Sequence, residues 1–351
     1  MGFKINSSNI GSAYRPYVIA EMSGNHNHSI EKALKIVDLA SDTGVDAIKL
    51  QTYTADTITM DVRGGLFEIK DPDSLWNGNN LYELYSKAYT PWEWHEQIFN
   101  HAKKRGLDCF SSPFDETAVD LLEDLNTPCY KIASFESNHH PLLKKVASTG
   151  KPVMISSGTS NLSELCEAIA VLRDNGCSSI VIMKCTSNYP ADARNANLNT
   201  IPVLQDIFSD CVIGISDHTM GIGVSVAAVA LGARVIEKHF TDSRSIGGVD
   251  SDFSMEPAEM KALVAESHIA FNSLGTVQLD HQKSEQSSRQ FRRSIYISNN
   301  IDEGEVFTQD NIKVIRPGDG MEPKYFEQVL GKSASKRLAR GTPLTHSDII
   351  Y

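Results

Sequence analysis

Short apolar runs alternate with longer segments of helical periodicity over most of the chain. We predict eight strands, at residues 17–21, 47–51, 108–112, 129–133, 152–156, 179–184, 212–216 and 235–239. We predict helices, from apolar residues that recur on one face, at about residues 29–43, 91–105, 115–125, 140–149, 161–175, 199–208, 220–232 and 257–272. Strands that are apolar without interruption are typical of parallel sheets with both faces covered.

Eight such repeats within roughly 270 residues predict an α/β fold of the closed (β/α)8 type, a TIM barrel. An open doubly wound sheet is the alternative, and the lack of a glycine-rich dinucleotide loop after the first strand disfavours it. Residues 52–90 form a polar and aromatic segment that is too long for an ordinary loop. We interpret this segment as a functional insertion.

The composition changes after the last predicted helix. We expect a barrel domain at residues 1–274, a polar linker at 275–290 and a small, mostly β domain at 291–351. A domain of about 60 residues has little core of its own, so we expect it to depend on a larger partner.

Charge and composition exclude several classes of protein. The 351 residues carry a formal net charge of −11, which disfavours nonspecific binding to nucleic acid. No apolar run reaches the roughly 18 residues of a membrane span, and the N-terminal segment lacks the apolar core of a signal peptide. The six cysteines show no paired spacing. We therefore expect reduced thiols in a cytoplasmic protein with no membrane or nucleic-acid partner.

The carboxyl ends of the predicted strands carry polar and ionisable residues, and this is where TIM barrels place their active sites. His218 and His239 end the last two strands, and neutral imidazoles are good ligands for a divalent metal. Two histidines alone are also compatible with a purely structural role. Glu21 and Glu136 are candidate acid–base groups.

A second set of strand-end residues is cationic or carries a hydroxyl group. It consists of Lys49, Lys131, Ser112, Ser134 and Ser156. This mixture suits a phosphate or phosphate–carboxylate ligand. With a Lewis-acid metal, the site predicts carbon–carbon bond formation between a small phosphorylated anion and an aldehyde. A Schiff-base aldolase that uses Lys49 or Lys131 and a non-catalytic sugar-binding protein are the alternatives.

Eight motifs in order resemble the sialic acid synthase family: IAEMSGNHN, IKLQTY, FSSPFD, YKIASFE, MISSGTS, KCTSNYP, GISDHT and IEKHF. The segment from residue 291 resembles the SAF (antifreeze-like) domain of the same family. The resemblance spans nearly the whole chain. It implies a metal-dependent enzyme that joins phosphoenolpyruvate to a 2-acetamido sugar, releases phosphate and makes a nine-carbon 2-keto acid.

The resemblance also implies roles for individual residues. His218 and His239 would hold Mn²⁺ or Mg²⁺, with Co²⁺ as a further candidate, and would share catalysis with Glu21. Lys49, Lys131, Ser112, Ser134 and Ser156 would bind phosphoenolpyruvate. Gln51, Glu136, Tyr189 and Asp250 would contact the sugar or metal-bound groups. Arg316 of the SAF domain would contact substrate in the partner's barrel, within a domain-swapped homodimer.

Three segments resemble the pseudaminic acid synthase branch and so indicate which sugar is used. They are residues 74–95, residues 244–257 and KCTS at 184–187. That branch uses 2,4-diacetamido-2,4,6-trideoxy-L-altrose. Trp76, Leu81 and Tyr82 are interpreted as apolar or stacking surface for this deoxygenated sugar. An N-acetylneuraminate or legionaminate synthase that uses a manno-configured sugar is the alternative.

Overall fold

The computed structural model describes residues 2–72 and 75–351. Residues 73 and 74, within the predicted insertion at 52–90, lie outside the described residues. The chain divides into two compact units, residues 1–275 and 276–351, and each is described by itself.

The first unit is a closed barrel of eight parallel strands in the order β10-β3-β4-β5-β6-β7-β8-β9, so the predicted TIM barrel is confirmed. The strands are β3 (Tyr17–Glu21), β4 (Ala47–Thr52), β5 (Asp108–Pro113), β6 (Tyr130–Ile132), β7 (Val153–Ser156), β8 (Ile180–Cys185), β9 (Val212–Ser216) and β10 (Val235–His239). Each lies within about a residue of its predicted limits, because a continuous apolar run is a clear signal for a buried strand.

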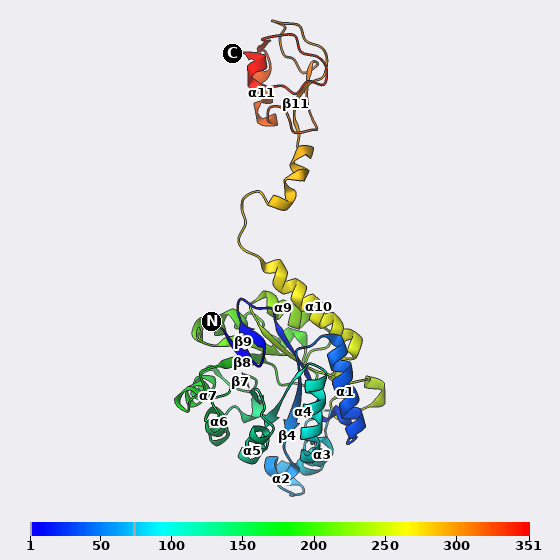
Figure 1. The fold of residues 1–351 in the computed structure, drawn as a ribbon, viewed down its shortest axis with the longest axis vertical. Coiled ribbons are helices and arrows are strands. Elements are labelled where there is room, and N and C mark those ends of the chain that lie inside the picture. Colours follow the sequence, from blue (N-terminus) through cyan, green and yellow to red (C-terminus); the bar gives the residue numbers. More distant parts are fainter. Residues whose placement is uncertain (1, 73–74) are drawn as a thin grey trace. The chain divides into compact units, whose positions relative to one another are not determined.

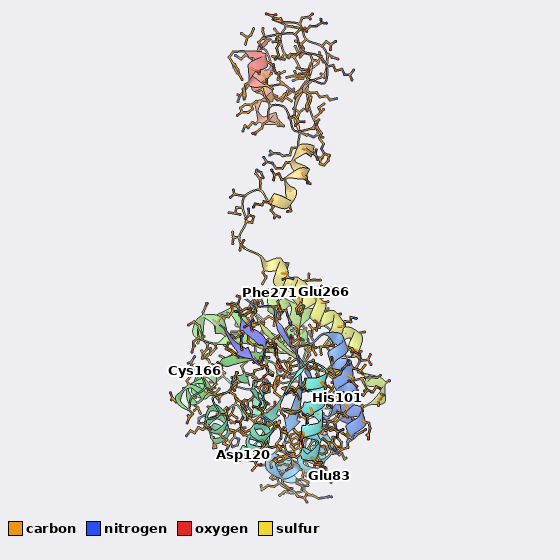
Figure 2. The ribbon with its side chains drawn as sticks, viewed as in Figure 1. Glu83, His101, Asp120, Cys166, Glu266 and Phe271 are labelled. Carbon is orange, nitrogen blue, oxygen red and sulfur yellow. The ribbon has the colours of Figure 1, made fainter. Side chains whose placement is uncertain are left out.

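Eight helices follow the strands and cover the outside of the barrel. They are α1 (Ile30–Thr43), α4 (His95–Lys104), α5 (Glu116–Asp124), α6 (His140–Ala147), α7 (Leu162–Asp174), α8 (Thr200–Ile207), α9 (Gly223–Ala230) and α10 (Pro257–Leu274). Figure 1 shows α1, α4, α5, α6 and α7 arranged around the strands. Asp120 on α5 and Cys166 on α7 are exposed on the outer side (Figure 2). The predicted helix at 220–232 is shorter, and the one at 91–105 begins with a 3-10 turn, Trp92–Trp94.

Alternate residues of each strand face opposite sides of the barrel wall. On β10, Val235 belongs to the apolar cluster that fills the lumen, whereas Ile236 belongs to the cluster between strands and helices. The lumen cluster also contains Phe110, Met154 and Val212. The amino-terminal half of the barrel interior is therefore a packed apolar core.

A hairpin that the sequence pattern did not predict precedes the barrel. Strands β1 (Gly2–Ile5) and β2 (Ser8–Gly11) pair antiparallel, and Ile5 and Ile10 join the lumen cluster. Each strand has only four residues, and half or more of them are exposed or half-buried, so no clear period is visible. The insertion also contains helices, α2 (Ala55–Ile58) and α3 (Leu81–Ala88).

The second unit contains two short antiparallel sheets around a small core. β11 (Ser294–Ile297) pairs with β12 (Ile312–Ile315), and β13 (Ser333–Ala334) pairs with β14 (Ile349–Ile350). A short helix, α11 (Phe326–Val329), and the side chains of Ile295, Phe307 and Leu344 complete the core. Every residue from 276 to 293 is exposed. Across both described ranges, no helix has the length and apolar character needed to cross a membrane.

Candidate functional site

The inward-facing residues at the carboxyl ends of the strands are polar, in contrast to the apolar lumen below them. Their position follows from strand parity, because Glu237 and His239 share the inward face with Val235. Lys131 on β6 reaches Glu237 on β10, at 3.4 Å from Nζ to Oε1. These two strands are not neighbours in the barrel, so the contact crosses the lumen. The strand ends therefore converge on one buried site.

Two lysines and two carboxylates form the centre of this site. Lys49 Nζ lies 2.6 Å from Glu21 Oε2 and 3.9 Å from Glu237 Oε1. All four side chains, including that of Lys131, are at most 5 % exposed. Their formal charges cancel, which allows such a group to be buried before any ligand binds.

Neutral groups extend this charged cluster around the barrel. Gln51 Nε2 donates to Glu21 Oε1 at 3.0 Å, and Lys49 Nζ donates to Ser112 Oγ at 3.2 Å. Ser216 Oγ donates to Glu237 Oε1 at 3.2 Å. Five predicted site residues, Glu21, Lys49, Gln51, Ser112 and Lys131, are thus brought into one connected network.

The two carboxylates have opposite pKa shifts. Burial raises the pKa of Glu21 to about 7, although Lys49 acts to lower it. Burial acts on Glu237 in the same direction, but Lys131 and Lys49 together hold its pKa below the ordinary value. Burial lowers the pKa of Lys49, but Glu21 and Glu237 raise it above the ordinary value. Near neutral pH the site therefore holds a permanent carboxylate, Glu237, and a carboxyl group that can exchange a proton, Glu21.

The two predicted metal ligands lie side by side at the rim of the site. The ring centroids of His218 and His239 are 5.4 Å apart. His218 Nδ1 lies 3.0 Å from the carbonyl oxygen of Thr186, which as an acceptor directs the lone pair of the ring to Nε2. His239 Nδ1 is buried and has no hydrogen-bond partner among the described residues. Burial, together with His218, lowers the pKa of His239 well below its ordinary value, so its ring is neutral.

Burial lowers the pKa of His218, but Cys185 and the Thr186 carbonyl raise it above the ordinary value, so a metal would displace a proton from this ring. The two adjacent rings, with nitrogen atoms available, fit a divalent metal. Within the described ranges, no group of three or more His, Cys, Asp and Glu side chains is arranged to hold one. The protein would therefore supply two ligands and leave the other positions to water or substrate, as catalytic metal sites leave positions open.

Asp250 and Tyr189 form the wall beside the histidines. Asp250 Oδ2 lies 3.9 Å from His239 Nδ1 and accepts a hydrogen bond from Ser23 Oγ. The Tyr189 ring lies 4.4 Å from the His218 ring, measured between centroids. Trp76 of the insertion lies 5.8 Å from Tyr189 in the same measure, and its Nε1 donates to the carbonyl of Val249. The insertion thus contributes Trp76 to the site rim.

The other two aromatic and apolar residues singled out in the insertion lie at the start of α3. The Tyr82 hydroxyl donates to Asp56 Oδ1 at 3.1 Å, within the insertion itself. Leu81 is half-buried. Of Trp76, Leu81 and Tyr82, it is Trp76 for which the structure describes a contact with a site residue, Tyr189.

Hydroxyl groups meet around Gly158, after β7. A Cβ atom at Gly158 would lie 2.2 Å from Ser187 Oγ and 2.5 Å from Ser134 Oγ, so only glycine allows this approach. Ser156 Oγ is buried and has no hydrogen-bond partner among the described residues. Burial raises the pKa of Glu136 to about 7, against the effect of Lys131. The side chains of Ser134, Ser187, Ser156 and Glu136 thus provide hydrogen-bonding groups that a ligand can use.

Glu237 and Cys185 are central residues that the candidate set did not include. Cys185 Sγ accepts a hydrogen bond from Ser134 Oγ at 3.5 Å. The alternation of inward-facing and outward-facing residues along a strand could have identified Glu237, because Glu237 lies two residues before His239. Arg316 belongs to the second unit, where it is exposed in the turn after β12.

The sequence matches the NeuB family over residues 36–279 and the SAF domain over residues 292–350. The chain therefore belongs to the NeuB family of nonulosonic acid synthases.

Individual relatives differ in the sugar acid that they make. The chain is 41% identical to the pseudaminic acid synthase of Campylobacter jejuni, over 97% of this chain and 98% of the relative. It is 36% identical to the N,N'-diacetyllegionaminic acid synthase of the same species, over 91% and 96%. The crystal structure of N-acetylneuraminic acid synthetase from Leptospira borgpetersenii matches with a TM-score of 0.73 and 29% identity, over 82% of this chain and 95% of that one.

Proposed function

We propose that this protein is a pseudaminic acid synthase. It condenses phosphoenolpyruvate with 2,4-diacetamido-2,4,6-trideoxy-L-altrose and releases phosphate. The observation that carries the proposal is the buried site at the strand ends, in which two lysines face two carboxylates beside the His218–His239 pair. The higher identity to a pseudaminic than to a legionaminic acid synthase supports the choice of sugar.

Lys49 and Lys131 bind the phosphate and carboxylate of phosphoenolpyruvate in this proposal, with Ser112, Ser134 and Ser156 as hydroxyl donors. Ser156 Oγ is suited to this role because its hydroxyl is buried without a partner among the described residues. A buried donor that the protein leaves unpaired favours a ligand that accepts its hydrogen bond.

His218 and His239 hold a divalent metal, Mn²⁺ or Mg²⁺, with Co²⁺ as a further candidate. When bound, such an ion supplies Lewis-acid polarisation of the sugar aldehyde. Tyr189 and Asp250 keep the two rings in place, and Trp76 closes the adjacent wall. With Gln51 and Glu136, these residues form the surface on which the open-chain sugar lies.

The bond changes follow from the two reactants. C3 of phosphoenolpyruvate attacks the aldehyde carbon, whose oxygen takes up a proton from water and becomes a hydroxyl group, and C2 becomes an oxocarbenium-like centre. Water adds to C2, and the tetrahedral intermediate loses phosphate by cleavage of its C–O bond. Glu21 accepts the proton of the attacking water, because its pKa of about 7 matches the pH at which the transfer must occur.

The Schiff-base alternative requires a neutral lysine as the nucleophile. Lys49 lies 2.6 Å from Glu21, and its pKa is raised above the ordinary value by Glu21 and Glu237, against the effect of burial. Lys131 is paired with Glu237. The contacts of Lys49 favour its protonated, anion-binding form, and the carboxylate of Glu237 is close enough to hold Lys131 in place.

The experiment that tests the proposal measures phosphate release from phosphoenolpyruvate with three acceptors. These are the altrose derivative, N-acetylmannosamine and 2,4-diacetamido-2,4,6-trideoxymannose, each with Mn²⁺ and after EDTA treatment. We expect metal-dependent release with the altrose derivative only. Turnover of either manno sugar instead would make the protein an N-acetylneuraminate or legionaminate synthase, and release that survives EDTA would contradict the metal.

A further inference from the structure

The buried lysines of the barrel differ in one respect. Lys49, Lys131 and Lys238 each have a carboxylate oxygen within 4 Å, at 2.6, 3.4 and 3.1 Å. Lys184, at the end of β8, is only 8 % exposed, yet among the described residues no carboxylate lies within that distance. Its ammonium group donates to Thr186 Oγ1 at 2.8 Å.

Asp217, the carboxylate that acts electrostatically on Lys184, already accepts four hydrogen bonds. Asp217 accepts from Thr219 N and Thr219 Oγ1 through Oδ1, and from Ser225 Oγ and Lys238 Nζ through Oδ2. Burial lowers the pKa of Lys184, against smaller opposing effects of Cys185 and Asp217. A buried cation without a close counter-charge costs free energy, so it indicates a missing anionic partner.

Lys184 lines a pocket of about 580 Å³ between the β7–α7 loop and α8. The described lining residues include no aspartate or glutamate, although the protein carries a net charge of −11. Hydroxyl and amide groups dominate the wall, among them Ser157, Asn188, Asn197 and Thr200. The pocket is thus locally positive and rich in neutral hydrogen-bonding groups.

Strand parity turns Lys184 and Cys185 to opposite faces of β8, and the pocket borders the lumen site through Cys185 and Ser187, which also line it. Lys184 and Ile182 lie on the same face of β8, and Ile182 belongs to the core outside the barrel wall. Cys185, one residue further, faces inward and contacts Ser134. The Lys184 side chain therefore starts from the outer face of β8, while Cys185 and Ser187 connect the pocket with the edge of the lumen site.

We propose that this pocket is a second binding site, which holds the carboxylate or phosphate of a small polyhydroxylated anion on Lys184. The ammonium group supplies the charge-assisted hydrogen bond, and the hydroxyl and amide wall contacts the sugar-like part of the ligand. The site goes beyond the proposed condensation and does not depend on it.

Calorimetric titration with inorganic phosphate and with N-acetylneuraminic acid tests this site, with uncharged N-acetylmannosamine as a control ligand. We expect a Lys184-dependent class of binding for both anions. Lys184→Met should weaken it at least tenfold and leave kcat in phosphate-free buffer within about twofold of the wild type. Lys151→Met, which removes a lysine paired with Glu123 outside the pocket, should leave binding unchanged.

A second variant keeps the test independent of the folding of Lys184→Met. Asn197→Asp is isosteric at an exposed position and adds a negative charge to the pocket wall, so it should weaken anion binding in the same direction. Unchanged phosphate binding in both variants would overturn the site. Binding of phosphate without binding of N-acetylneuraminic acid would overturn the polyhydroxylated ligand, and loss of turnover in Lys184→Met would assign Lys184 to the lumen site instead.

Discussion

Two buried groups of charged residues at the ends of the strands differ in how completely their polar atoms are hydrogen-bonded. Outside the barrel wall, Lys238 donates to Asp217 Oδ2 at 3.1 Å and to the carbonyls of Thr219 and Gly221, at 2.5 and 3.0 Å. Inside the lumen, Glu237 Oε2, Ser156 Oγ and His239 Nδ1 have no hydrogen-bond partner among the described residues.

The outward group is complete within the protein, which is what a structural ion pair requires. The inward group is electrically balanced but leaves hydrogen-bonding atoms unused. An incomplete polar network in a well-packed barrel is costly unless a ligand completes it. Hydrogen bonding of the polar atoms, more than burial or charge, therefore distinguishes the structural group from the functional one.

The largest effect is expected when the inward group loses its proton carrier. Glu21→Gln keeps the size and the contacts with Gln51 but cannot accept a proton, so kcat should fall by about 10²- to 10⁴-fold. The melting temperature should be unchanged or higher, because burial disfavours the charged form of Glu21. A fall in kcat of less than tenfold would remove Glu21 from catalysis.

The outward group should respond in the opposite way. Lys238→Met leaves Asp217 buried without its cation, and we expect the free energy of unfolding to fall by about 3–5 kcal/mol. Lys151→Met, which breaks a half-exposed pair with Glu123, is the matched control and should cost about 0–1 kcal/mol. Urea denaturation measures both, and equal losses would contradict the contrast between the groups.

A third experiment asks whether the inward group is complete within one chain. We propose that Arg316 serves the barrel of a partner chain in a homodimer. Chains with Glu21→Gln and chains with Arg316→Ala should each be nearly inactive. Unfolded together and refolded as a mixture, they should recover about one quarter of wild-type activity, because half of the dimers then carry one intact site.

Recovery in that mixture requires Glu21 and Arg316 to act from different chains. Refolded wild-type protein is the control for the yield of refolding. No recovery above the sum of the two variants would contradict the exchange of SAF domains between subunits.

The smallest effect is the pH dependence of stability. The pKa of Glu21 is raised to about 7 in the folded protein, so between its ordinary value of 4.5 and about 7 the folded state binds more protons than the unfolded state. Stability is then lost as the pH rises through this window. We expect the difference in melting temperature between wild type and Glu21→Gln to shift in favour of the variant from pH 5 to pH 8, and a constant difference would contradict the raised pKa.

The sequence alone predicts much of this architecture. The eight barrel strands are recognisable because both of their faces are covered. Serine favours helix N-caps, and the Ser29 hydroxyl accepts from Lys32 N at the start of α1. The hairpin β1–β2 escapes prediction because its strands are short and partly exposed. Contacts between distant strands also escape it, since the pairing of Lys131 with Glu237 depends on the closure of the barrel.

The alternation of residues between the two faces of β10 could have extended the predicted site. Glu237 and Lys238 are adjacent in the sequence, yet the first faces the lumen and the second pairs with Asp217 behind the wall. Counting by two from His239 would have selected Glu237. The pairing of each lysine with its own carboxylate depends on side-chain distances, which only the three-dimensional structure provides.

The most direct measurement is the binding of phosphoenolpyruvate, by calorimetry, to the wild type, to Lys131→Met and to Lys151→Met. Lys131→Met should lose affinity for phosphoenolpyruvate by at least tenfold, because it removes a charge-assisted contact with the anion. Lys151→Met, the control, should bind as the wild type does. Equal affinity of all three proteins for phosphoenolpyruvate would show that the inward group of charges is structural, like the outward one.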